Sequence, residues 1–103
     1  MTPDQLTAEI KSATDYQTNK RLLQEKIKTD LHLTYNGGLF LLTPALIAFV
    51  TTWPEQDLFL EDIYSNPIPV QRDEFLTQAR EQYHTVMNSW HIEHEKLRRI
   101  RKV

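Results

Sequence analysis

The sequence of 103 residues contains no cysteine. This absence excludes disulfides, thiolate nucleophiles, thiolate zinc sites and iron–sulfur clusters. Because small secreted domains usually depend on such cross-links, it favours an intracellular setting. The first residues form neither a basic segment nor an apolar run, and no lipidation motif is present. We therefore expect neither a signal peptide nor a membrane anchor.

The sequence also lacks a surplus of charge and a long hydrophobic run. Twelve Lys and Arg against fourteen Asp and Glu give a net charge of −2, so any electrostatic function must be local. The most apolar stretch, residues 39–53, is interrupted by Thr43-Pro44 and is shorter than the roughly 20 residues of a membrane span. With 40% hydrophobic and 25% charged residues, the chain is predicted to form one soluble domain, residues 1–103, with no membrane partner.

Glycine is scarce, and both glycines follow Asn36 in an Asn-Gly-Gly sequence. Apolar residues alternate before this point, from Leu31 to Tyr35, and an apolar run follows it. Asn-Gly favours a type I′ turn, which needs a positive φ at both central residues. The sequence therefore predicts a β-hairpin over residues 31–43, since a phosphate-binding loop would require a longer glycine pattern.

Two long segments without glycine or proline predict helices, residues 4–31 and 73–102. Thr2-Pro3 provides a cap and a proline suited to the first helical position. Thr43-Pro44 repeats this signal before a short helix that ends at Pro54. Alternation over residues 58–70, broken by turn residues, predicts a second hairpin whose prolines mark an edge.

These elements predict an α+β fold, in which two long antiparallel helices bracket a small β-hairpin module with a short central helix. At 1.5 Å per residue the last helix would be roughly 45 Å long, whereas a compact domain of this size is about 33 Å across. The last helix is therefore expected to extend beyond the rest of the domain.

The last helix carries a heptad pattern with an apolar stripe. Phe75 and Met87 widen this stripe, so two helices are not expected to cover it, and a second chain is predicted to do so. We therefore expect a homo-oligomer, with a dimer favoured. The predicted oligomer interface consists of Leu76, Tyr83, Val86, Trp90 and Leu97.

The end of this helix is strongly basic. It suggests a contact with nucleic-acid phosphate or with an acidic protein surface. The alternative is that these cations complement the helix macrodipole and face Asp4 and Glu9 of the first helix. The residues concerned are Lys96, Arg98, Arg99, Arg101 and Lys102.

No set of residues forms a complete catalytic or metal-binding pattern. His84, His91 and His94 share the last helix, but their spacing is not that of a zinc protease, and the first helix has no histidine to complete a di-iron site. An acidic cluster around the second hairpin fits a solvated edge strand better than an acid–base pair. That cluster comprises Glu55, Asp57, Glu61 and Asp62. We expect no catalytic residue, metal or cofactor; a metal-dependent hydrolase or oxidase at the histidines is the weakest alternative.

Five segments of the chain resemble small proteins of T4-like tailed phages, including those of cyanobacteria. They are LTYNGGLF at 33–40, TPALIAF at 43–49, NPI at 66–68, NSW at 88–90 and EKLR at 95–98. The likeness covers roughly residues 31–101. It implies a protein that acts in the cytoplasm of an infected bacterium or in the virion, through assembly or binding.

The leading functional hypothesis is a non-enzymatic interaction or assembly protein that self-associates through its last helix and binds a protein partner. The alternative is a nucleic-acid accessory factor that uses the basic helix end, with affinity that falls as salt rises.

Overall fold

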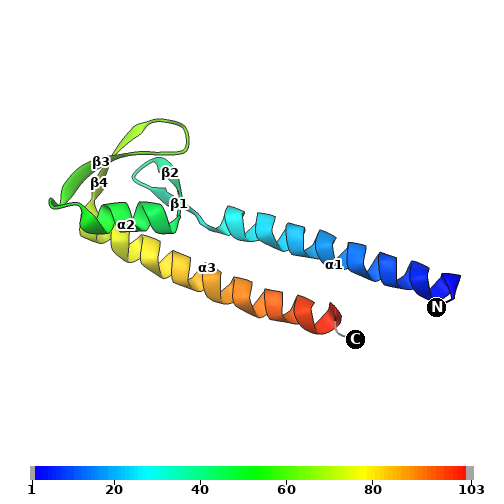
Figure 1. Cartoon of the computed structure of the whole chain (residues 1–103). Helices are drawn as coiled ribbons and strands as arrows, with labels where there is room; N and C mark the ends of the chain where they lie inside the picture. Colours follow the sequence, from blue (N-terminus) through cyan, green and yellow to red (C-terminus); the bar gives the residue numbers. More distant parts are fainter. Residues whose placement is uncertain (1, 102–103) are drawn as a thin grey trace.

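The computed structural model describes the backbone of residues 2–101 and the side chains of residues 2–6 and 15–99. It contains three helices and two antiparallel β-hairpins, which confirms the α+β class. The helices α1 and α3 lie side by side and antiparallel, and we call this part the stalk (Figure 1). The hairpins and the short helix α2, residues 32–71, form the head at one end of α3. The head lies beyond the C-terminal end of α1 and not between the two long helices (Figure 1).

Helix α1 (Pro3–Asp30) begins as its sequence predicts. The Thr2 hydroxyl accepts the N–H of Gln5, and the Gln5 side chain accepts the N–H of Thr2, which completes a capping box. At the other end, Nδ1 of His32 lies 2.8 Å from the carbonyl oxygen of Lys28. These side chains satisfy backbone groups that a helix end leaves unpaired.

Strands β1 (His32–Tyr35) and β2 (Gly38–Leu41) form the first hairpin. Asn36 has a φ of 48° and Gly37 a φ of 84°, so both central residues adopt the positive φ that a type I′ turn needs. The predicted turn is confirmed.

Helix α2 (Pro44–Thr52) follows, and the Thr43 hydroxyl accepts the N–H of Leu46 as its cap. Two arginines join α2 to α3 (Arg72–Arg101). Arg72 donates to the carbonyl oxygen of Trp53 at 2.7 Å, and Arg80 donates to the Thr51 hydroxyl at 2.9 Å. These bonds place α2 against the first turns of α3.

Strands β3 (Asp57–Glu61) and β4 (Pro67–Gln71) form the second predicted hairpin. Its residues alternate strictly between buried and exposed, with Leu58 and Leu60 facing the core. The two hairpins remain separate two-stranded sheets. An isolated hairpin is marginally stable in water, so each depends on the core beneath it.

The core centres on Phe75, at the start of α3, whose side chain is fully buried. Its ring makes edge-to-face contacts with Tyr35 and Phe40, with centroids 5.4 Å apart in both pairs. The prediction that Phe75 adds to a stripe needing cover from another chain is therefore wrong. The first hairpin of the same chain folds over it.

The molecule is elongated, measuring 66 × 23 × 19 Å with a radius of gyration of 19.4 Å. A compact chain of this length would have a radius of gyration near 13 Å. The difference arises from the stalk, because two helices side by side have no third layer to cover their outer faces (Figure 1). Within the described residues, no helix has the length and hydropathy needed to cross a bilayer.

Candidate functional site

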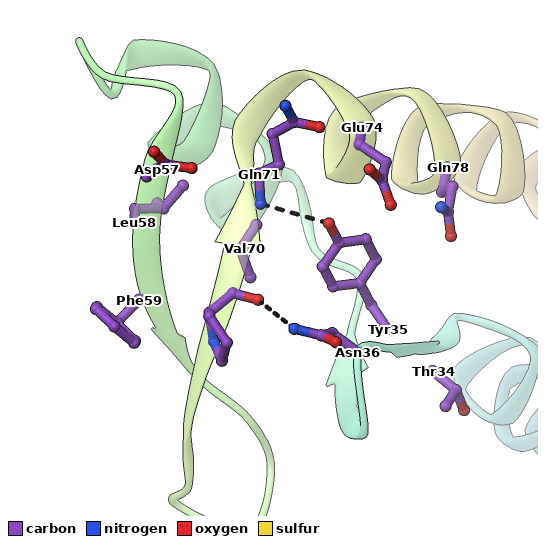
Figure 2. Close-up of a pocket in the computed structure, with 11 residues that line it drawn as sticks. Thr34, Tyr35, Asn36, Asp57, Leu58, Phe59, Val70, Gln71, Glu74 and Gln78 are labelled. Atoms are coloured by element: carbon purple, nitrogen blue, oxygen red, sulfur yellow. Dashed lines mark hydrogen bonds between the residues drawn. The ribbon is translucent and has the colours of Figure 1, made fainter.

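A groove of about 650 Å³ crosses the head between the two hairpins and the start of α3. In Figure 2, Asp57 and Phe59 lie on one side of it, and Thr34 and Asn36 on the other. Two carboxylates and several amide and hydroxyl groups line it, which suits it to hold cations or N–H donors. The lining residues are Thr34, Tyr35, Asn36, Asp57, Leu58, Phe59, Pro69, Val70, Gln71, Glu74 and Gln78.

Two hydrogen bonds attach β4 to the first hairpin. The Asn36 amide donates to the carbonyl oxygen of Pro69 at 3.0 Å, and the N–H of Gln71 donates to the Tyr35 hydroxyl at 3.4 Å (Figure 2). Both use backbone groups of β4 that point away from β3. One edge of the second hairpin is thus covered by the first.

The outer face of β3 presents an aromatic residue between two acids. The Phe59 side chain is 74% exposed, whereas its neighbours Leu58 and Leu60 are 6% and 5% exposed. Pro69 lies opposite Phe59 in the pairing register, and Asp57 and Glu61 are exposed on the same face. Phe59 and Asp57 also line the groove, so an aromatic ring and a carboxylate lie together on one accessible surface.

Asp62, predicted as part of the acidic cluster, instead joins the two hairpins. Its carboxylate accepts the N–H groups of Asn66 at 2.9 Å, Tyr64 at 3.0 Å and Leu39 at 3.3 Å. A second link runs from the N–H of Ile63 to the carbonyl oxygen of Leu39, at 2.9 Å. Asp62 therefore has a structural role, while Asp57 and Glu61 remain available at the surface and Glu55 is exposed in the loop before β3.

Asp62 should make stability depend on pH. The hydrogen bond from the N–H of Asn66, with those from Leu39 and Tyr64, holds the pKa of Asp62 below its usual value. Its stabilising effect is complete above the unfolded pKa, near 4, and is lost as pH falls through the lower folded pKa. We expect urea unfolding of the wild-type chain to show this loss at acidic pH, and Asp62→Asn to show a flatter dependence.

Some dependence should remain in that variant, because Arg72 and Gln56 likewise hold the pKa of Asp73 below its usual value. Asp73→Asn is therefore the comparison variant, since it should remove the part of the pH dependence that Asp73 contributes and keep the part that Asp62 contributes. Equal pH dependence in Asp62→Asn and the wild-type chain would contradict the role of Asp62.

The structure separates the residues predicted for the oligomer interface. Leu76 is in the core of the chain itself and Tyr83 packs against that core, while Val86 is also buried. Leu97 is half-buried, and Trp90 is 38% exposed, with its ring centroid 5.9 Å from that of His94. Tyr83, Trp90 and Leu97 are thus the members of the predicted interface that retain accessible surface, and Trp90 is the most exposed of them.

The basic helix end is partly paired within its own helix. Lys96 contacts Glu93 at 3.4 Å and Arg98 contacts Glu95 at 2.9 Å. Such exposed pairs are weak and leave both residues able to exchange partners. Arg99 is exposed, whereas Lys102 and the side chains of Arg101 and Glu9 lie outside the described residues. Binding of nucleic acid or an acidic partner at this end stays a prediction.

The histidines of α3 lie apart from the groove. His84 contacts the Asn88 amide at 3.2 Å, and His91 is exposed. In the part of the chain with described side chains, no three His, Asp or Glu residues are grouped closely enough to hold a metal ion.

Two residues that position the groove were not predicted. The Gln82 amide donates to the carbonyl oxygens of Asp30 and His32, at 2.9 and 2.7 Å, and so ties α3 to the junction of α1 and β1. Asn36 was predicted only as a turn residue, yet its side chain also holds β4. Both act over more than thirty residues of sequence, where no local pattern signals the contact.

Comparison of the chain with protein-family models, curated proteins and solved structures found no match.

Proposed function

We propose that this chain is a non-enzymatic interaction protein whose copies associate through the stalk and whose head binds a protein partner. The observation that carries the proposal is Trp90, which lies on the stripe where α3 meets α1 and is still 38% exposed. A tryptophan in that position favours contact with another chain, because Trp is enriched among residues that dominate binding energy.

The apolar row that α1 presents is interrupted, which limits how much of α3 it can cover. In the part of α1 whose side chains are described beyond residue 14, the half-buried or buried residues are Tyr16, Lys20, Leu23 and Ile27. Lys20 interrupts this apolar row, and a lysine tends to keep its ammonium group in water. A second stalk would supply the apolar surface that this part of α1 lacks.

The head supports the second part of the proposal. It is presented at one end of an elongated molecule, and its outer face combines the exposed Phe59 with the groove (Figures 1 and 2). A stalk that joins copies and a head that binds a partner is an arrangement suited to assembly. The phage setting implied by the sequence resemblance stays a prediction.

The self-association is tested by sedimentation over a range of protein concentrations. We expect the wild-type chain to form a dimer or larger species, and Trp90→Asp to weaken association by about thirtyfold or more, as for loss of a hot-spot residue. Ile92→Asp is the matched control, because it introduces the same charge at a residue that is exposed on the opposite side of α3. A monomeric wild-type chain, or equal effects of the two variants, would refute this part of the proposal.

A further inference from the structure

The outer edge of β3 is an unpaired strand edge. In an antiparallel pair, opposite residues either exchange both backbone hydrogen bonds or point both groups away from each other. Pro67 and Pro69 have no N–H to exchange, and the outward groups of Pro69 and Gln71 bond to the first hairpin. Pro67, Pro69 and Gln71 therefore belong to the pairs whose backbone groups point away from the opposite strand.

Their partners in the register are Asp57, Phe59 and Glu61. The backbone N–H and C=O groups of these three residues must then point out from the free side of β3. Within the described part of the chain, nothing hydrogen-bonds to them. β4 lies between β3 and the first hairpin, so neither β4 nor the first hairpin reaches the free side of β3 (Figure 2).

The two edges of the hairpin are treated differently by the sequence. Natural proteins blunt exposed edges with prolines, charges, bulges or a covering element. The β4 edge has two prolines and is held by Asn36 and Tyr35, whereas β3 has no proline and no cover. Its protection consists of Asp57 and Glu61, which repel a strand of like charge and attract one of opposite charge.

The charge around this edge is strongly negative. Residues 55–74 contain six acids and one arginine, a net charge of −5, although the whole chain carries only −2. A strand added to β3 would place alternate side chains beside Asp57, Phe59 and Glu61, within about 5 Å of them. Cationic residues there would meet both carboxylates, and a guanidinium could also stack on the Phe59 ring.

We propose that the head binds its partner by strand addition: an extended segment with Arg or Lys side chains four residues apart, beside Asp57 and Glu61, pairs with the free edge of β3. This inference rests on the proposed function, since it names the chemistry of the partner that the head binds. Main-chain hydrogen bonds provide the affinity in this mode, and the side chains beside Asp57, Phe59 and Glu61 provide the specificity.

The test uses two capped seven-residue peptides, Thr-Arg-Thr-Val-Thr-Arg-Thr and the same sequence with Glu in place of both Arg. Binding to the full chain is followed by NMR, through the amide signals of Asp57, Phe59 and Glu61. We expect the Arg peptide to shift these signals, with an affinity that falls as salt rises. The Glu peptide should not bind.

Charge reversal at the edge provides the decisive comparison. Asp57→Lys with Glu61→Lys should weaken binding of the Arg peptide by about tenfold or more and should allow the Glu peptide to bind. The matched control, Glu25→Lys with Glu81→Lys, changes the net charge equally at exposed positions on α1 and α3 and should keep the wild-type preference. Phe59→Pro removes one edge N–H at a position where a strand tolerates proline, and should also weaken binding.

Three results would overturn the inference. If neither peptide shifts the amide signals of β3, β3 is not the site. The same conclusion follows if the control double variant weakens binding of the Arg peptide as strongly as the edge double variant does. If the Glu peptide binds β3 of the wild-type chain better, the cationic partner is wrong while binding by the head stands. Stalk association is measured separately by sedimentation, so its failure is distinguishable from both.

Discussion

Phe75→Ala should lower the free energy of unfolding by about 3–5 kcal/mol, the usual cost of removing a large aromatic side chain from a core. Phe75 is fully buried, and Tyr35 and Phe40 contact its ring edge-to-face. Each such pair contributes about 0.5–1.5 kcal/mol beyond the buried area. Because a domain of this size has only about 5–15 kcal/mol of stability, this single change should leave it marginal.

The measurement is chemical and thermal unfolding of both proteins at one protein concentration, since association would stabilise the folded state. At about 4 °C per kcal/mol, Tm should fall by roughly 12 °C or more. Phe59→Ala makes the same chemical change at an exposed position and should alter stability by no more than about 0.5 kcal/mol. Similar losses in both variants would show that Phe75 does not hold the head to α3.

Features that depend on neighbouring residues could be predicted from the sequence. The Asn36-Gly37 turn, the Thr2 and Thr43 caps and the alternation of β3 each follow from local backbone geometry and hydropathy. Their bounds in the structure agree closely with the predicted ones. The fold class followed from these elements in turn.

Features that depend on tertiary contacts could not be predicted in this way. The heptad of α3 shows which residues share a face, but not that the first hairpin covers its beginning and α1 only part of its remainder. For the same reason Leu76 was assigned to an interface between chains, although it lies in the core of one. Asp62 was grouped with its acidic neighbours because sequence does not reveal that Leu39 donates to it from the other hairpin.

The candidate binding surface on the head could be predicted only in part. The alternation over residues 58–70 predicted the second hairpin, and its prolines predicted an edge. The open edge, however, is that of β3. Only the bonds from Asn36 and Tyr35 show that the β4 edge is already covered.

Gly38→Ala should destabilise the chain by about 1–3 kcal/mol, the usual cost of overpacking a core. A Cβ at this position would lie 2.5 Å from Cγ1 of Ile68 and 3.1 Å from Cε2 of Phe40. Ile68 is buried and paired with Leu60 in the second hairpin, so it has little room to move. Gly38 is therefore required because the two hairpins approach each other closely at this point.

Removing the obstructing side chain tests this cause. Ile68→Ala is destabilising alone, but combined with Gly38→Ala it should cost less than the sum of the two changes, with a coupling of about 0.5–3 kcal/mol. Gly37→Ala is the matched control: its Cβ would meet nothing within 4 Å, and its cost arises from the φ of 84°. Ile68→Ala should give no such rescue there. Additive losses at Gly38 would mean that the hairpins do not meet through Ile68. Coupling at Gly38 but not at Gly37 would support the position of the second hairpin against the first, and with it the position of the β3 edge.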